Sequence, residues 1–431
     1  MEQIAVALQK IPVEQLQVGH YIQLDGSWKD YPFLFRSFKI KNKKQIKIII
    51  DLGLKTISYD PAKSKVKAAK PEAPEKTVEA ETPEPVAVAE ETDKKAIQQA
   101  YQDRTRRLEK LKERRLSQHR CEKAFKNSVN NVNDLMGDMR AQPKETLVAT
   151  EKLVDDIVSD AMGHQNTTMQ LINIKGQDKN SHHHLVNITM LSLIVGKELG
   201  LDDLEMKQLG AGAMLHDLGK MKIQERIVRK TSPLNEIELR TYQMYPQYGA
   251  KLAKKHGNLD KEVIQIIEQH REHEDGTGFP NQLKSEQISK LSKIVAITAA
   301  YDDHCNSPRN KKQLTPYEAM SLMYSQTKYD ENILSIFINR LGVYPPGTLV
   351  KLSDGSFAGV TGVNHDDLLN PQVILYDEEV PKDEAMIIEL SEEKDLSVEE
   401  AVRRNEAPKE ILAYMNFGGS MNYFIDPSAN N

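Results

Sequence analysis

The chain has 431 residues, of which 39% are hydrophobic and 28% are charged. That length suits two or three domains with a substantial core. The net charge of -5 is spread over many residues of both signs, so overall charge does not indicate a nucleic acid or an anionic membrane as partner.

Two cysteines, Cys121 and Cys305, exclude a disulfide framework and fit a reducing compartment. The N-terminal sequence lacks the basic start and apolar core of a signal peptide. No apolar run is long enough to span a bilayer. We therefore expect a cytoplasmic protein without a membrane span.

The first part of the chain predicts a small α/β domain over residues 1–62, where β-branched and aromatic runs alternate with Gly, Pro and Asp. Residues 63–95 are rich in Pro, Ala, Glu and Lys without apolar periodicity, which predicts a disordered linker. Residues 96–142 predict a charged connecting helix. A dimerising helix is the less favoured alternative, because a sustained heptad is missing.

The second part predicts a helical bundle over residues 143–345, where almost every segment has helical apolar spacing. Residues 346–385 switch to a period of two and contain Asp354-Gly355, a hairpin signal, which predicts a short β appendage. Residues 386–431 give weak signals and are expected to form a C-terminal tail. The expected fold class is mainly α, with a small α/β domain before the bundle and a β appendage after it.

Histidines and carboxylates concentrate at the ends or first turns of four predicted helices in the bundle. This placement is how helical bundles build metal sites, from side chains that project off facing helices. The residues are His182, His183 and His184 on one helix, His216 and Asp217 on another, His270 and His273 on a third, and Asp302, Asp303 and His304 on a fourth.

The segment "HDLGK", residues 216–220, combines an imidazole, a carboxylate and an ammonium within five positions. Mixed nitrogen and oxygen donors favour Fe, Mn, Zn or Ni over Mg. Such a metal can generate hydroxide at neutral pH and neutralise a phosphoryl group, and Lys220 is placed to meet phosphate charge. A lone His-Asp pair is a weak signal, and a histidine at a helix start is more often a surface or core residue. The combination with distant histidines strengthens the functional interpretation.

Taken together, these motifs resemble the HD-GYP family of HD metal-dependent phosphohydrolases over roughly residues 170–345. "HHHLVNI" resembles the family's metal-binding helix, "HDLGK" its His-Asp doublet with Lys, and "EDGTGFP" the loop that names it, with Phe279 at the tyrosine position. Residues 11–62 resemble the small DUF3391-like domain often fused ahead of it. "GVYPPGTLVKLSDG" resembles the β segment that often follows.

The resemblance implies an HD-type helical bundle, a centre of two or three metals, and hydrolysis of a cyclic dinucleotide, either cyclic di-GMP or mixed cyclic GMP-AMP. Carried over residue by residue, it also implies the roles of individual side chains. They are His184, His216, Asp217 and His270 as metal ligands, His216, Asp217 and Lys220 as catalytic residues, and Lys220, Gly278, Phe279 and Pro280 as substrate-binding residues.

The chain departs from the family at several ligand positions. Tyr245 and Arg271 stand where the family has metal-binding histidines, Ala299 replaces an aspartate, and Asn180 replaces the glutamate of three-metal members. Alanine offers no donor, a phenol with a pKa of about 10 is a poor ligand, and a guanidinium cannot ligate. We therefore expect one divalent ion, Fe, Mn or another, or none.

Two residues are candidate replacements for the missing ligands: Asp302, one turn beyond Ala299, and His273, one turn beyond His270. Arg271 also has a constructive interpretation, because with Lys220 it could bind phosphate where a metal is lost.

Two functions follow. The first, slightly favoured, is a phosphodiesterase that opens a cyclic dinucleotide to its linear form with a partly degenerate metal site. The alternative is a silent HD-GYP module that binds a cyclic dinucleotide, or a partner protein through the loop Asp275–Pro280, as a signalling receptor.

Overall fold

The computed structural model describes residues 8–25, 31, 33, 37–40, 42–62, 64, 66, 89–162, 169–174, 182–257, 259–307, 314–378, 380, 385, 387–393, 396–403, 405–415 and 420–425. The chain divides into two compact units. One comprises Met1–Lys112 with Asp377–Met386, and the other comprises Glu113–Tyr376 with Ile387–Asn431. Among the described residues, no helix is both long and apolar enough to cross a membrane.

The N-terminal unit is built on a four-stranded antiparallel sheet in the order β1-β4-β2-β3. Ile22, Ile49 and Ile57 are fully buried between the sheet and the helix, and Asn42 caps the helix by accepting a hydrogen bond from the Gln45 amide. The small α/β fold predicted for this region is confirmed. Its elements are β1 (Gln9–Pro12), β2 (Tyr21–Gln23), β3 (Ser37–Lys39), α1 (Lys43–Asp51) and β4 (Thr56–Asp60).

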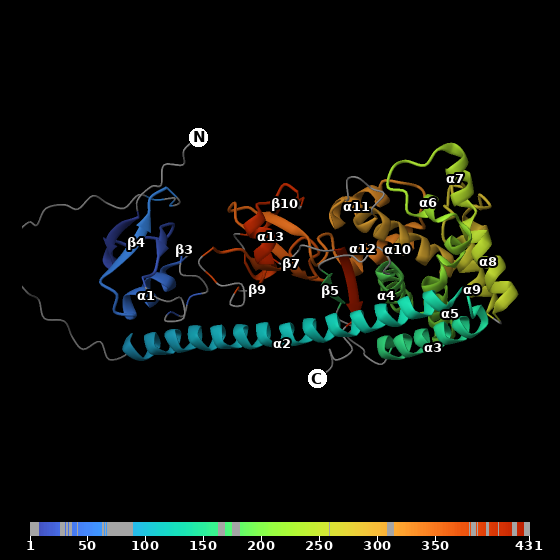
Figure 1. Ribbon diagram of the computed structural model, residues 1–431. Coiled ribbons are helices and arrows are strands. Elements are labelled where there is room, and N and C mark those ends of the chain that lie inside the picture. Colours follow the sequence, from blue (N-terminus) through green and yellow to red (C-terminus); the bar gives the residue numbers. More distant parts are fainter. Residues whose placement is uncertain are drawn as a thin grey trace, which may run out of the picture. The chain divides into compact units, whose positions relative to one another are not determined.

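A long helix, α2 (Ala89–Asp138), precedes the helical unit (Figure 1). It begins inside the segment predicted as linker, and most of that segment, residues 67–88, lies outside the described residues. Its C-terminal half is not solvated on all sides, because Cys121, Phe125 and Val129, spaced four residues apart, are buried in the main core. This half of α2 is therefore part of the helical unit, and not only the charged connecting helix that the sequence predicts.

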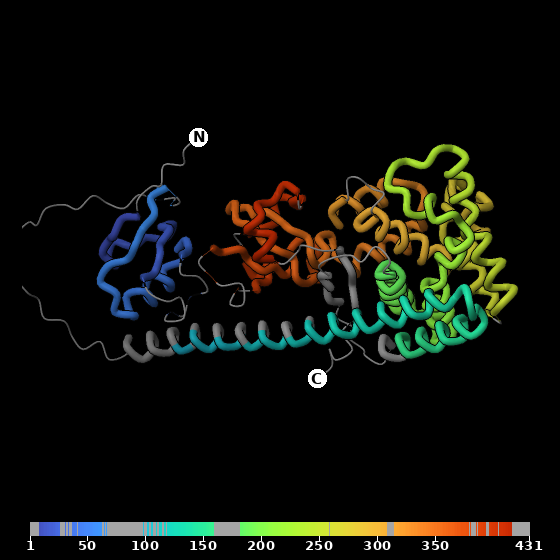
Figure 2. Tube along the Cα trace, viewed as in Figure 1, coloured from blue at the N-terminus to red at the C-terminus, as the bar shows by residue number. Residues whose placement is uncertain are grey.

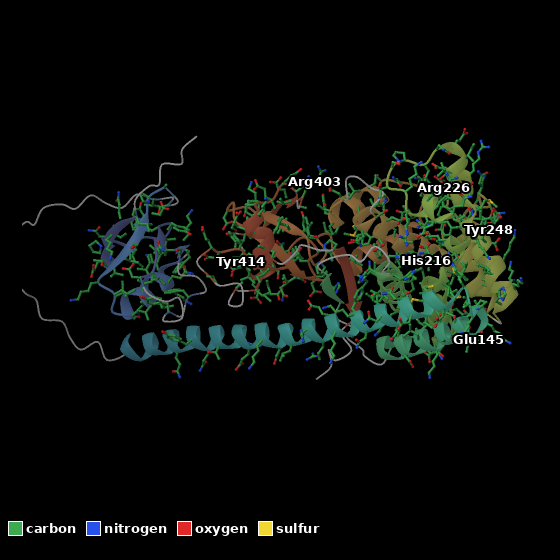
Figure 3. The ribbon with its side chains drawn as sticks, viewed as in Figure 1. Glu145, His216, Arg226, Tyr248, Arg403 and Tyr414 are labelled. Atoms are coloured by element: carbon green, nitrogen blue, oxygen red, sulfur yellow. The ribbon has the colours of Figure 1, made fainter. Side chains whose placement is uncertain are left out.

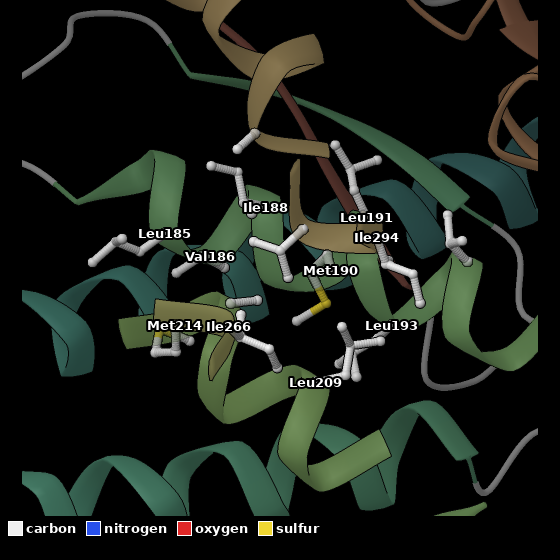
Figure 4. Packing of buried hydrophobic residues seen from close by; sticks show 14 of the residues in the cluster. Leu185, Val186, Ile188, Met190, Leu191, Leu193, Leu209, Met214, Ile266 and Ile294 are labelled. Atoms are coloured by element: carbon white, nitrogen blue, oxygen red, sulfur yellow. The ribbon is translucent and has the colours of Figure 1, made fainter. Parts of the chain in front are cut away.

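The helical unit is organised around α4, which is buried along almost its whole length from Leu185 to Gly196. A helix that is apolar all round belongs inside a bundle. Figure 4 shows its side chains packed against Leu209 and Met214 of α5 and Ile266 of α9, and Figure 2 traces the surrounding helices from green to orange. The helices are α3 (Pro143–Met162), α4 (His183–Glu198), α5 (Asp203–Leu215), α6 (Glu225–Val228), α7 (Glu236–Gln243), α8 (Tyr245–His256), α9 (Lys261–Gln269), α10 (Lys290–Asn306), α11 (Pro316–Tyr324) and α12 (Glu331–Leu341).

Two β structures accompany the bundle. The predicted appendage is part of an antiparallel five-stranded sheet in the order β10-β6-β7-β8-β9. A separate two-stranded pair joins β5, which interrupts the helical sequence between α3 and α4, to β11 near the C-terminus. The C-terminal segment predicted as a tail thus supplies β9, β10, α13 and β11. Their bounds are β5 (Met169–Ile174), β6 (Leu349–Leu352), β7 (Phe357–Gly362), β8 (Gln372–Leu375), β9 (Ile387–Glu389), β10 (Val398–Val402), α13 (Lys409–Met415) and β11 (Ser420–Ile425).

Candidate metal centre

Most of the predicted site residues lie at helix ends that converge inside the helical unit. His184 is in the first turn of α4, His216 caps the end of α5, and His270 caps the end of α9. Figure 3 labels His216 inside the bundle. The short helix η3 (Leu218–Lys222) carries Lys220. The chain turns sharply at these ends, so polar groups from separate helices meet in one place.

Gly219 allows the closest of these approaches. A Cβ atom at this position would lie 1.8 Å from the carbonyl oxygen of Tyr245 and 2.5 Å from the amide nitrogen of Gly249. Only glycine lets η3 touch α8 backbone to backbone. This contact places Lys220 beside the Tyr245 ring, with its Nζ 5.2 Å from the ring centroid.

His184, His216 and Asp217 form a cluster in which one possible ligand atom from each residue lies within 4.8 Å of the others. His184 Nε2 lies 3.0 Å from Asp217 Oδ2. The side chains of His216 and Asp217 are 1% and 8% exposed, whereas the His184 side chain is 37% exposed. The cluster therefore opens toward solvent on the His184 side.

The pairing of His216 with Asp217 favours a bound cation. His216 Nδ1 donates to the Ala213 carbonyl over 2.7 Å, since a carbonyl oxygen can only accept. Burial lowers the pKa of His216 to about 4, so the imidazole is neutral at pH 7 and Nε2 carries a lone pair. That lone pair lies 3.4 Å from Asp217 Oδ1, a buried oxygen that accepts no hydrogen bond from the described residues. Two buried acceptors facing each other fit a shared metal ion.

Lys220 holds the other oxygen of the same carboxylate. Its Nζ donates to Asp217 Oδ2, and its side chain is 24% exposed. Burial raises the pKa of Asp217, but Lys220, His216 and His184 together outweigh burial and keep that pKa well below its ordinary value. Asp217 is therefore ionised at neutral pH, as a metal ligand must be.

His270 lies close to His216, with 5.0 Å between the ring centroids, but both of its nitrogens are already used. Nδ1 donates to the Ile267 carbonyl over 3.0 Å, and Nε2 accepts the Tyr245 hydroxyl over 2.7 Å. Burial raises the pKa of Tyr245, which keeps the phenol protonated and able to donate. His270 as a metal ligand stays a prediction, and this geometry gives it a protein partner instead.

Arg271 completes a network at the positions where the resemblance placed a second metal. Its Nε donates to the Tyr245 hydroxyl over 2.8 Å, and Nη1 donates to Asp303 Oδ2 over 2.6 Å. Asp303 belongs to the cluster of polar residues seen in the sequence, but the sequence predicts no role for it. Its sequence signal was only its place beside Asp302, since the pairing depends on the end of α9 facing α10.

The two candidate replacement ligands lie outside the cluster of His184, His216 and Asp217. Asp302 is 5% exposed, and its Oδ1 accepts the side-chain amides of Asn187 and Asn306 over 2.6 and 2.8 Å. His273 Nδ1 is 3.0 Å from the Thr277 hydroxyl oxygen.

The loop Asp275–Pro280 is fixed against the end of α9. A Cβ atom on Gly278 would lie 2.4 Å from both the Cα atom of Glu272 and the amide nitrogen of His273, so this position requires glycine. The Phe279 amide donates to the Arg271 carbonyl over 3.0 Å, and its ring stands edge-on to Tyr245 at 6.3 Å. Phe279 and Pro280 are partly buried, which puts this loop beside the network of Tyr245 and Arg271.

Comparison with known proteins identifies the chain. Residues 8–150 match the model of a domain of unknown function, DUF3391, and residues 152–333 match that of an HD domain. A cyclic di-GMP phosphodiesterase of Pseudomonas aeruginosa is 28% identical, over 86% of this chain and 85% of that protein. The chain is an HD-domain protein of the HD-GYP type. The order of domains predicted from the sequence, DUF3391 and then HD, is that of the matched models.

Other relatives match this HD-GYP protein over shorter spans. The cyclic di-GMP phosphodiesterase PdeB of Borreliella burgdorferi is 30% identical over 42% of this chain and 48% of its own length. A solved HD-GYP-type protein of Bdellovibrio bacteriovorus is 17% identical, with a TM-score of 0.43, covering 77% of this chain and 98% of that one.

Proposed function

We propose that this HD-GYP protein is a phosphodiesterase that opens a cyclic dinucleotide, cyclic di-GMP or mixed cyclic GMP-AMP, to its linear form with one divalent metal ion. Its relatives, including one that matches over most of both chains, are phosphodiesterases of cyclic dinucleotides by name. The observation that carries the proposal is the buried pair of acceptors, His216 Nε2 and Asp217 Oδ1, with His184 alongside.

His184, His216 and Asp217 would hold the ion. Two imidazoles and a carboxylate suit Fe, Mn or another borderline transition metal. When bound, such an ion supplies a hydroxide nucleophile at neutral pH and offsets phosphate charge. The Ala213 carbonyl fixes the His216 tautomer through Nδ1, so Nε2 is the nitrogen available to the metal.

Lys220 and Arg271 would bind the phosphate. Both are partly exposed cations, with side chains 24% and 17% exposed, and both contact Tyr245, Lys220 at its ring and Arg271 at its hydroxyl. Lys220 acts as a point charge, whereas Arg271 presents a planar fork that Asp303 holds in place. The loop that contains Gly278, Phe279 and Pro280 would support Tyr245 from beside it, because the Phe279 ring contacts the Tyr245 ring.

A receptor that binds a cyclic dinucleotide without hydrolysing it is the second candidate. The hydrogen-bonded set of Tyr245, His270 and Arg271 favours it, because these groups satisfy each other where two-metal relatives are expected to hold an ion. Whether the protein is an enzyme or a receptor, a protein partner of the loop Asp275–Pro280 would contact its exposed residues, Asp275 and Thr277.

Metal content and product analysis of the full chain distinguish the two. For the enzyme we expect about one Fe or Mn per chain by mass spectrometry and linear dinucleotide by chromatography, and His216→Ala should abolish both. His365→Ala, at an exposed histidine in the β appendage, is the matched control and should retain both. Dinucleotide binding without metal or turnover would reject the enzyme and support the receptor.

A further inference from the structure

A cavity of 280 Å³ lies beside the candidate metal centre. It shares His270 and Arg271 with the site, and the His270 ring is 5.0 Å from that of His216. α10 supplies Asp303, and the segment between α11 and α12 supplies Lys328 and Tyr329. A group bound here would therefore be an immediate neighbour of a phosphate bound at the centre.

The size of the cavity suits a fragment of the substrate. Pockets for whole drug-sized ligands range from about 300 to 1,000 Å³, and this cavity is just below that range. Ala296 and Ala300 line it with small side chains, and the Tyr329 ring stands edge-on to His273 at 6.1 Å. In a lining that is otherwise mostly polar, these two alanines leave room beside the Tyr329 ring for a flat π-system with polar edges, such as a nucleobase.

The polar groups of the cavity would bind guanine better than adenine. Guanine presents two adjacent donors, N1–H and the 2-amino group, which a carboxylate can accept together, whereas adenine presents the N1 lone pair on that edge. Guanine also carries the O6 and N7 acceptors, which lysine or arginine can bind. Asp303 provides the carboxylate, while Lys328 and Arg271 provide the donors.

Asp303 has the capacity for this contact. It pairs with Arg271 through Oδ2 over 2.6 Å, yet its side chain is 47% exposed, and a carboxylate has about four acceptor sites. Burial raises the pKa of Asp303, but the charges of Arg271 and Lys220 and the hydrogen bond from Arg271 together lower it below its ordinary value. The carboxylate is therefore ionised at neutral pH and oriented by its ion pair.

We propose that this cavity binds one guanine base of the cyclic dinucleotide and that Asp303 selects guanine over adenine. The inference rests on the proposed cyclic-dinucleotide ligand and adds a base-binding subsite and a specificity residue. Because the cavity is sized for one base, a ligand with a single guanine should satisfy it.

The test is the affinity of the full chain for three ligands, measured by titration calorimetry: cyclic di-GMP, mixed cyclic GMP-AMP and cyclic di-AMP. The first two should bind within about threefold of each other, and cyclic di-AMP at least about tenfold more weakly, as for one bidentate base contact. Asp303→Asn should reduce this preference to within about threefold. Asp302→Asn is the same change one residue earlier in the chain. The Asp302 side chain faces Asn187, so this variant should keep the wild-type order of affinities for the three ligands.

A second variant covers the case in which Asp303→Asn does not fold. Ala300→Leu fills the cavity from its lining and should weaken both guanine-containing ligands to the level of cyclic di-AMP. Equal wild-type affinity for all three ligands, or an unchanged preference in Asp303→Asn and Ala300→Leu, would overturn the inference. Product analysis of the same samples is independent: guanine preference without any turnover rejects the proposed enzyme and leaves the base subsite intact.

Discussion

At the scale of single residues, the site shows how two substitutions change the chemistry of a metal position. The Tyr245 hydroxyl accepts a hydrogen bond from Arg271 Nε and donates one to His270 Nε2. A permanent cation there would repel a divalent metal ion by about 8 kcal/mol at about 4 Å and an intermediate dielectric, twice the value for two unit charges. The sequence alone predicts the missing ligands. It does not predict Asp303 as the counter-ion of Arg271, because that pairing depends on how α10 faces the end of α9.

Asp302 gives a pH-dependent prediction at this scale. Burial raises its pKa to about 6, above the usual value of a free aspartate, so the folded state binds the proton more tightly than the unfolded state. Its contribution to stability is full below about pH 4 and is lost as pH rises through about 6. Asp302→Asn retains an oxygen to accept from Asn187 and should be more stable than wild type at pH 7, by up to about 3 kcal/mol.

Denaturant unfolding at pH 4 and pH 7 checks this. The gain from Asp302→Asn should be present at pH 7 and absent at pH 4, because the wild-type carboxyl is protonated in the acidic sample. A gain of equal size at both pH values would mean that charge burial is not the cause. Asp330→Ala, at the partly exposed N-cap of α12, should instead destabilise by about 1 kcal/mol at both pH values, because the Ile333 amide loses the side-chain oxygen that caps it.

At the scale of elements, helical spacing predicted the bundle because the buried faces repeat every three to four residues, most plainly in α4. The same pattern missed β5, a six-residue strand between two helices, and β11, whose segment gave weak local signals. Within the part of the chain that the structure describes, each strand is paired only with the other, so its structure depends on a partner about 250 residues away in the chain, beyond any local window.

The contact between η3 and α8 gives a prediction for this scale. Gly219→Ala would place a Cβ atom 1.8 Å from the Tyr245 carbonyl oxygen, so the two backbones must separate. We expect a loss of about 1–3 kcal/mol or more of stability and a lower affinity for cyclic dinucleotide, because Lys220 and Tyr245 move apart. Gly137→Ala is the matched control: no atom lies within 4 Å of its Cβ position in α2, so it should be neutral or slightly stabilising. Equal unfolding midpoints for the two variants would show that the contact is not needed.

At the scale of the whole molecule, the helical unit is completed by segments from outside the predicted bundle. The C-terminal half of α2 adds Phe125 and Val132 to the core, and β11 pairs with β5 and lies against α4. α4 carries His184, so these distant segments help to fix one edge of the candidate metal centre. Domain boundaries drawn from composition alone would cut through both contributions.

Truncation of the chain tests the contribution of β11. Ending the chain after Met415 removes β11 and leaves the backbone groups of β5 without the ladder that joins Met169–Ile174 to Ser420–Ile425. We expect amide exchange in residues 169–174 to accelerate by about 100-fold or more, and the unfolding temperature to fall by about 5 °C or more. Ending the chain after Ile425 keeps β11 and should preserve both values. If the two truncated proteins exchange these amides at the same rate, β11 does not stabilise β5, and the C-terminal strand has no part in positioning α4 and His184.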